Sequence, residues 1–208
     1  MSTLINRLLA TLPPGHPGLF NPWADRCPHE SLADGVAGRI QRLKSHLDCD
    51  PSFILVGEAP GYQGCRYSGV AFTSERLLLE GRIPRIPAPT GRLSTRPLPF
   101  SEPSATVVWR TLRELGMEDE TVLWNALQMH PHHPKEPWSN RSPARAELAL
   151  GTPALKLLRR AFPNATFVPV GKKAEAILRD ADIRAAPYVR HPANGGATAF
   201  ARGLRGVA

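Results

Sequence analysis

Three polar side chains, Glu58, Asn125 and His191, have types and positions that could support chemistry. Each follows an apolar stretch with the composition of a buried β-strand. A carboxylate can position or deprotonate a water molecule. A side-chain amide offers both donors and an acceptor, and a neutral imidazole can donate a hydrogen bond. Together the three groups could hold a polar ligand and position the water that attacks it.

The elements before these side chains predict how they come together. Four short apolar runs have the composition of strands: 53–57, 121–124, 165–170 and 186–189. The run at 53–57 has no polar alternation, which is typical of a strand covered by helices on both faces. The carboxyl ends of parallel strands lie on one edge of a sheet, where α/β proteins bind ligands. We therefore expect Glu58, Asn125 and His191 to converge at that edge.

Helical periodicity between the strands predicts the fold class. Helices are expected at 3–11, 32–47, 74–79, 103–115, 143–160 (with a break near 151–153) and 172–179. Strands that alternate with helices indicate a parallel sheet with right-handed crossovers. The predicted fold is α/β: a three-layer α/β/α sandwich with a central, mainly parallel four-stranded sheet. A chain of this length predicts a single domain spanning residues 1–208.

The stretch 81–100 contains five prolines, four arginines and two glycines, so regular structure is not expected there. Two interpretations are open. The stretch is either a surface loop or a basic arm beside the active site, with its arginines on phosphates.

The charge of the chain favours a polyanionic partner. Twenty-six Lys and Arg residues against 18 Asp and Glu give a net charge of +8 and a pI of about 10.0. An excess of this size is compatible with an ordinary soluble basic protein or with a surface that binds a polyanion, of which nucleic acid is the usual one. No signal peptide and no membrane-spanning segment is apparent, so we expect a cytoplasmic monomer that binds DNA and no membrane.

The three cysteines, Cys27, Cys49 and Cys65, form neither a CxxC pair nor an even disulfide framework. This pattern is typical of a reducing compartment and argues against a four-cysteine cluster.

The strand ends resemble those of the uracil-DNA glycosylase superfamily. The segment 57–61 (GEAPG) matches the first motif of the family 4 enzymes, and 69–72 (GVAF) is similar to their Gly-x-Pro-Phe segment. Asn125 falls where the family has its uracil-reading asparagine. The segments 140–143 (NRSP) and 191–196 (HPANGG) resemble its Asn-Arg-x-Pro and His-Pro-Ser motifs. The similarity covers about residues 50–200, in the order and spacing of the family.

This resemblance implies a monofunctional DNA glycosylase of base excision repair, which hydrolyses the N-glycosidic bond of uracil or a related deaminated base. The implied roles are a hydrogen bond from His191 to uracil O2, recognition of N3–H and O4 by Asn125, and stacking of Phe72 on the base. Glu58, or backbone groups of 58–62, would position the attacking water. The candidate residues for substrate binding are Gly57, Ala59, Pro60, Gly61, Tyr62, Phe72 and Asn125, and those for DNA binding are Arg190, Asn194, Gly195 and Gly196.

Two of these assignments have an ordinary alternative. Tyr62 would line the pocket or belong to a solvated loop. The segment 194–196 would enter the minor groove or form a common glycine-rich turn.

The sequence also departs from the family pattern. No cysteine follows Cys65, so we expect no iron–sulfur cluster and no other cofactor. Ala59 stands where family 1 enzymes have a water-activating aspartate, and Ala193 replaces the serine of the His-Pro-Ser motif. The chain is therefore expected to be a cluster-free relative whose substrate can differ from plain uracil.

Other functions remain open. Loss of the aspartate at Ala59 is compatible with a protein that binds DNA damage without catalysis. A nucleotide- or cofactor-binding α/β enzyme is a weaker alternative, because the glycine spacing after 53–57 is neither GxGxxG nor a Walker A loop. A nucleosidase acting on free nucleosides would need few phosphate contacts.

The histidines at 130, 132 and 133 suggest a zinc site, but no Cys or carboxylate lies at ligand spacing. We expect a basic loop near DNA and no metal. Trp109 and Trp124 are expected in the core, whereas Trp23 and Trp138 lie in predicted loops that either pack or contact nucleic acid.

Overall fold

The centre of the molecule is a parallel sheet. The computed structural model describes residues 2–32 and 34–207. The sheet has the order β3-β2-β5, in which β2 (Phe53–Gly57) pairs with β3 (Thr121–Asn125) and with β5 (Thr166–Pro169). Gly57 lies opposite Asn125 in the register. The unbroken apolar composition of β2 is explained by its central position, since it has a neighbour on each side and helices on both faces.

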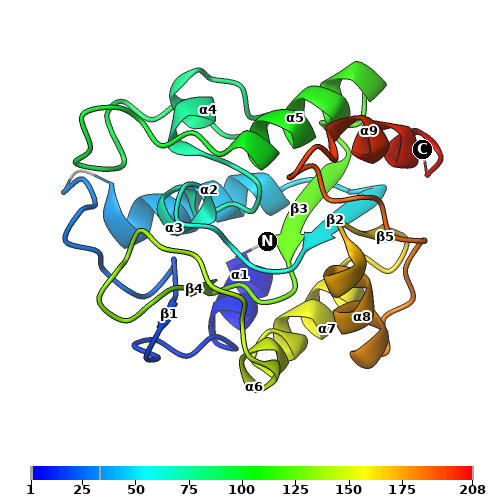
Figure 1. Cartoon of the computed structure of the whole chain (residues 1–208), viewed down its shortest axis with the longest axis horizontal. Helices are drawn as coiled ribbons and strands as arrows, with labels where there is room; N and C mark the ends of the chain where they lie inside the picture. Colours follow the sequence, from blue (N-terminus) through cyan, green and yellow to red (C-terminus); the bar gives the residue numbers. More distant parts are fainter. Residues whose placement is uncertain (1, 33, 208) are drawn as a thin grey trace.

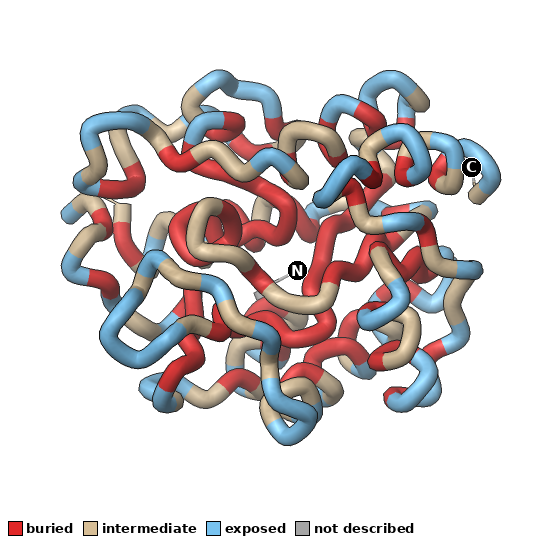
Figure 2. Tube along the Cα trace, viewed as in Figure 1, coloured by how far each residue is buried: buried red, intermediate tan, exposed pale blue. Residues whose placement is uncertain are grey.

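Two layers of helices cover the sheet (Figure 1). One face packs against α1 (Ser2–Leu9), α2 (Gly35–Leu47), α7 (Thr152–Ala161) and α8 (Lys172–Asp180). The other packs against α4 (Glu75–Leu79), α5 (Pro103–Leu115) and α9 (Ala197–Arg205). Within β2, Leu55 packs on the side of α4, α5 and α9, while Ile54 and Val56 pack on the side of α1, α2, α7 and α8. Successive side chains of a strand point to opposite faces of the sheet. The strands are buried throughout the middle of the molecule (Figure 2), and the predicted α/β class is confirmed.

The predicted fourth strand is reduced to one contact. Residues 186–189 run beside β5 and form a single parallel bridge, between Val170 and Val189. Ala186 N–H donates to Phe167 O (2.8 Å) and Val189 N–H donates to Pro169 O (2.9 Å), so the segment advances three residues where β5 advances two. Pro169 has no N–H to donate in return, and a regular ladder does not form between these two bonds. The four-stranded sheet is therefore not confirmed, and three strands are paired. The segment still runs in the direction of β5, so it brings His191 to the carboxyl edge.

Several short elements were not predicted. They are α3 (Cys65–Ser68), α9, and the antiparallel pair of β1 (Leu19–Phe20) and β4 (His130–Pro131). The predicted helix 143–160 is divided into α6 (Arg145–Ala149) and α7, as its glycine and proline suggested. Gly151 lies between them, and its missing side chain allows a close approach to the segment that follows β3, since a Cβ there would lie 1.9 Å from Ala126 O.

The stretch 81–100 forms neither helix nor strand, as predicted. The buried Glu75 carboxylate anchors it by accepting hydrogen bonds from the N–H groups of Leu93, Ser94 and Phe100. Its four arginines contact the protein: Arg82 pairs with Glu80, Arg85 binds Asp119 O, Arg92 pairs with Glu75, and Arg96 lies over the Phe100 ring. These contacts favour the surface loop over the basic arm.

Among the helices of the described residues, none has the length and apolar composition needed to cross a membrane.

Candidate active site

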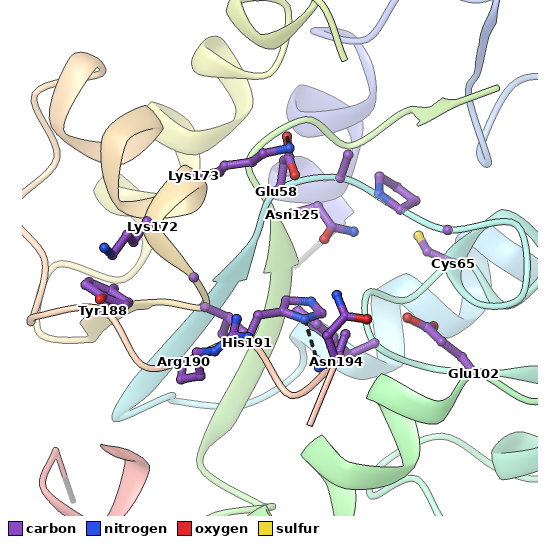
Figure 3. Close-up of a pocket in the computed structure, with 17 residues that line it drawn as sticks. Glu58, Cys65, Glu102, Asn125, Lys172, Lys173, Tyr188, Arg190, His191 and Asn194 are labelled. Atoms are coloured by element: carbon purple, nitrogen blue, oxygen red, sulfur yellow. Dashed lines mark hydrogen bonds and ion pairs between the residues drawn. The ribbon is translucent and has the colours of Figure 1, made fainter. Parts of the chain in front are cut away.

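A cavity of about 770 Å³ opens at the carboxyl edge of the sheet (Figure 3). Glu58 follows β2, Asn125 ends β3, and His191 follows the bridge at Val189; all three line the cavity. The convergence predicted from the strand ends is therefore present in the structure. A cavity of this volume is large enough for a base-sized ligand.

A second cavity of about 840 Å³ continues from the first. The two share a wall made of 58–61, Glu102, His191, Ala193 and Asn194. The second extends along 140–143 and past Gly195. The NRSP and HPANGG segments noted in the sequence therefore border one continuous hollow.

His191 is held in one tautomer. Ala193 N–H donates to its Nδ1 (3.1 Å), so the neutral ring carries its proton on Nε2. Burial, together with the charge of Arg190, lowers the pKa of His191. The ring is therefore neutral at neutral pH and has an Nε2–H donor available. Gly196 allows this turn, because a Cβ there would lie 2.0 Å from His191 O.

Asn125 and Phe72 meet next to the last residue of β2. A Cβ on Gly57 would lie 2.8 Å from Asn125 Oδ1 and 2.7 Å from Phe72 Cζ. The ring of Phe72 is 6.1 Å from that of His191, and its backbone adopts a positive φ of 48°, which is uncommon for a bulky residue. Asn125 is 5% exposed, and its side-chain amide has no hydrogen-bond partner among the described residues. That amide is therefore available to a ligand.

Glu58 forms an ion pair with Lys173 at the rim of the cavity. Lys173 Nζ lies 3.0 Å from its Oε1 and 3.3 Å from Ser142 Oγ. Lys172 and Lys173 were not singled out from the sequence, although a signal was present. Two lysines in the first turn of α8 oppose the helix dipole, and such an arrangement suggests a use other than helix stability.

Glu102 also lines both cavities and was missed. It precedes α5 but makes no capping hydrogen bond with that helix. Burial raises the pKa of its carboxyl group to about 7. An acidic residue beside a proline is ordinary at a helix start, so the sequence did not distinguish Glu102 from a normal first turn.

Tyr62 does not line either cavity, contrary to the prediction. Its ring packs edge-on against the buried ring of Phe100, with centroids 5.8 Å apart. This apolar contact removes part of the Tyr62 ring from water. Its N–H donates to Asn140 Oδ1 (3.1 Å), so Tyr62 helps to hold the loops together. Gly57 and Gly196 also lie outside the lining, and a Cβ at either position would collide with neighbouring atoms.

The other predicted contact residues do line the hollow. Ala59, Pro60, Gly61, Phe72, Arg190 and Asn194 line the first cavity, and Gly195 lines the second. Lys172, Tyr188 and Arg190 form one side of the first cavity, opposite Glu102 (Figure 3).

His130 is buried and is not part of a basic surface, contrary to the prediction. Arg66 Nη1 donates to its Nδ1 (2.9 Å), and its Nε2–H donates to Asn140 Oδ1 (3.1 Å). Burial and the nearby Arg66 lower its pKa to about 3. The histidine is therefore neutral and positions Asn140 at the edge of the second cavity.

The two loop tryptophans differ in burial. Trp23 is buried and stacks on Trp124, with centroids 6.2 Å apart. Trp138 is 39% exposed, and its Nε1–H donates to Tyr67 Oη (2.7 Å).

Comparison with known proteins gives a match at the level of the fold. No family model matches the chain, and no curated protein matches it. The crystal structure of wild-type SMUG2 from Pedobacter heparinus superimposes with a TM-score of 0.64 and 14% sequence identity, over 98% of this chain and 96% of that one. The chain therefore shares its fold with SMUG2, a member of the uracil-DNA glycosylase family.

Proposed function

We propose that this protein is a DNA glycosylase that hydrolyses the N-glycosidic bond of uracil or a related deaminated base. The observation that carries the proposal is the meeting of three groups in one cavity: the Nε2–H of His191, the unpartnered amide of Asn125 and the ring of Phe72. The shared fold with SMUG2 supports the same conclusion.

The chemistry requires stabilisation of the leaving base. Cleavage of the bond builds positive charge on the sugar and negative charge on the base. A fixed donor aimed at a carbonyl oxygen of the base stabilises that negative charge in a site that excludes water. His191 supplies such a donor, because its Nδ1 is occupied by Ala193 N–H and its ring is neutral.

The base must leave the helical stack to reach the cavity. The Asn125 amide can accept from N3–H of uracil and donate to O4, or do the reverse pairing with another deaminated base. Phe72 offers a flat apolar face for stacking. Arg190, Asn194 and Lys172 would contact the sugar-phosphate backbone beside the extruded base.

Single-turnover base release tests the proposal. Oligonucleotides that carry uracil, hypoxanthine or xanthine are supplied as single strands and as mismatched duplexes. We expect release of at least one base, and a decrease of about 10²–10³-fold in His191→Ala, the range for losing one transition-state donor. Asn125→Asp should change which base is released, because it removes the amide donor.

His133→Ala is the matched control, since His133 is exposed and lines neither cavity. Its rate should equal that of the wild type. Base release by His191→Ala at the wild-type rate would contradict the proposed role of the imidazole.

A second candidate function is damage recognition without catalysis. It is favoured by Ala59 at the place of the family 1 aspartate and by the ion pair that occupies Glu58. Tight binding of uracil-containing DNA with no release of any base would select this function.

A further inference from the structure

The proposed function leaves one carboxyl group in the cavity without a role, that of Glu102. It has no hydrogen-bond or ion-pair partner in the part of the chain that the structure describes, and it lines both cavities. Glu102 is half-buried, and a carboxyl group that faces a cavity without a partner is a candidate to act on what the cavity holds.

The surroundings of Glu102 are shaped to accept its side chain. Gly64 faces it so closely that a Cβ there would lie 1.9 Å from Glu102 Oε2. The side chain turns away from the N-terminus of α5 and directs its carboxyl group into the cavity, beside Cys65 and Asn194 (Figure 3). The carboxyl therefore occupies a defined place in the wall, across from Lys172 and Tyr188.

Glu58, the carboxylate first expected to position water, is in a different situation. Lys173 Nζ holds one of its oxygens at 3.0 Å. That oxygen is engaged by a cation, whereas neither oxygen of Glu102 has a partner in the described part of the chain. Of the two carboxyl groups that line the cavity, Glu102 is the one free to act on a water molecule.

We propose that Glu102 is the general base that activates the attacking water, an inference that rests on the proposed glycosylase function. The water oxygen forms a bond to C1′ of the sugar while one of its protons passes to the Glu102 carboxylate. The bond between C1′ and the base nitrogen breaks, and its electron pair leaves on the base. The Nε2–H of His191 stabilises that charge, and the proton on Glu102 then returns to the base through solvent. The products are the free base and an abasic sugar.

The ionisation of Glu102 suits this role. Burial raises its pKa to about 7, near the value at which a general base is most effective. The titratable and charged groups that line the two cavities around it are Cys65, Glu58, Lys172, Lys173, Tyr188, Arg190, His191 and Arg141. Burial raises the pKa of the Cys65 thiol far above its usual range, and the pKa of His191 is lowered. The Cys65 thiol therefore stays protonated across the range of the test, and His191 titrates below its usual pKa, so Glu102→Gln is needed to assign a rise near pH 7 to Glu102.

The test is the pH dependence of single-turnover base release from about pH 5 to about pH 9. In the wild type, the rate should rise about tenfold per pH unit up to about pH 7 and then level off, because only ionised Glu102 accepts a proton. Glu102→Gln should lower the plateau by about 10²–10⁴-fold and remove the rise. Its affinity for the same DNA should remain at the wild-type value.

Three further variants make the test specific. Glu58→Gln is the same change at the other carboxylate of the cavity and should keep the rise with pH. Glu114→Gln, on the exposed face of α5, should behave as the wild type in rate and profile. Gly64→Ala displaces the Glu102 carboxyl without removing it and should lower the rate while the base remains bound.

The outcomes separate the two proposals. A wild type that releases base, with a Glu102→Gln variant of equal rate and profile, would overturn the role of Glu102 and leave the glycosylase function standing. Loss of the rise in Glu58→Gln instead would assign the base to Glu58. A wild-type rate that falls above pH 7 would show that the protonated carboxyl acts as a donor, which also overturns the role. A wild type that releases no base would overturn both proposals.

Discussion

At the scale of single residues, the glycines around the cavity determine how closely the candidate catalytic groups approach one another. Gly57 ends β2, and its missing side chain leaves space for the ring of Phe72 and the amide of Asn125. The sequence named Gly57 as a substrate-binding residue; in the structure it lies outside the cavity lining, next to two residues that belong to the lining.

We predict that Gly57→Ala lowers the rate of base release by about 100-fold, because displacing a positioned group by about 1 Å has an effect of that size. The added Cβ would lie 2.7 Å from Phe72 Cζ and 2.8 Å from Asn125 Oδ1, so both groups must move. Single-turnover kinetics measure the effect. Gly91→Ala is the control, because a Cβ there meets no described atom within 4 Å. Equal losses in both variants would indicate a general destabilisation instead.

At the scale of secondary-structure elements, a buried histidine joins helix α2 to strand β3. Leu123 N–H donates to His46 Nε2 (2.8 Å), so the side chain takes the place of a neighbouring strand at this point. Burial and the charge of Arg85 lower the pKa of His46 to about 3. Periodicity predicted the helix, but its pairing with the backbone of a particular strand depends on the packing.

We predict that His46→Ala lowers the free energy of unfolding at pH 7 by about 2–4 kcal/mol, since it leaves Leu123 N–H unpaired and opens a cavity. His46 binds its proton more weakly in the folded state than in the unfolded state. Its stabilising effect is therefore complete above about pH 6.5 and is lost as the pH falls toward 3.

Denaturant unfolding from pH 7 to pH 4 measures both effects. The wild type should lose stability steeply over this range, and His46→Ala should lose less. The exposed His133→Ala should follow the wild type. An unchanged slope in His46→Ala would exclude His46 as a source of the acid sensitivity.

The segment 186–189 shows how one residue changes an element. Its apolar composition predicted a strand, but Pro169 of β5 has no N–H to donate to it, and only Val189 forms a bridge, with Val170. The segment was also predicted to bring Arg190 and His191 to the edge of the sheet. That prediction did not depend on regular strand pairing, and it agrees with the structure.

At the scale of the whole molecule, the net charge of +8 is expected to govern binding to DNA. Lys172 and Arg190 line the first cavity without a carboxylate partner in the described part of the chain, whereas Lys173 is paired with Glu58. Lys172 Nζ lies 6.0 Å from the centroid of the Tyr188 ring, so both side chains lie on the same wall.

We predict that Lys172→Ala weakens DNA binding to the same extent for uracil-containing and undamaged sequences, because a phosphate contact carries no base information. The slope of log affinity against log salt should decrease by about 1 in magnitude. Lys156→Ala is the matched control, since Lys156 is exposed on α7 and lines neither cavity. A Lys172→Ala slope equal to that of the wild type would show that Lys172 does not contact a phosphate.

The sequence by itself determined the class of fold and the place of the site. Unbroken apolar runs, helical periodicity and the order of elements are local properties, and parallel strands must bring their carboxyl ends together. Glu58, Asn125 and His191 were therefore located together before any distance was known.

The tertiary structure decided how each of them is paired. Lys173 binds Glu58 across 115 positions of sequence, Tyr62 turns to Phe100, and Glu102 enters the cavity from a helix start. Such contacts depend on distances and burial between remote segments, and no local pattern of residues encodes them.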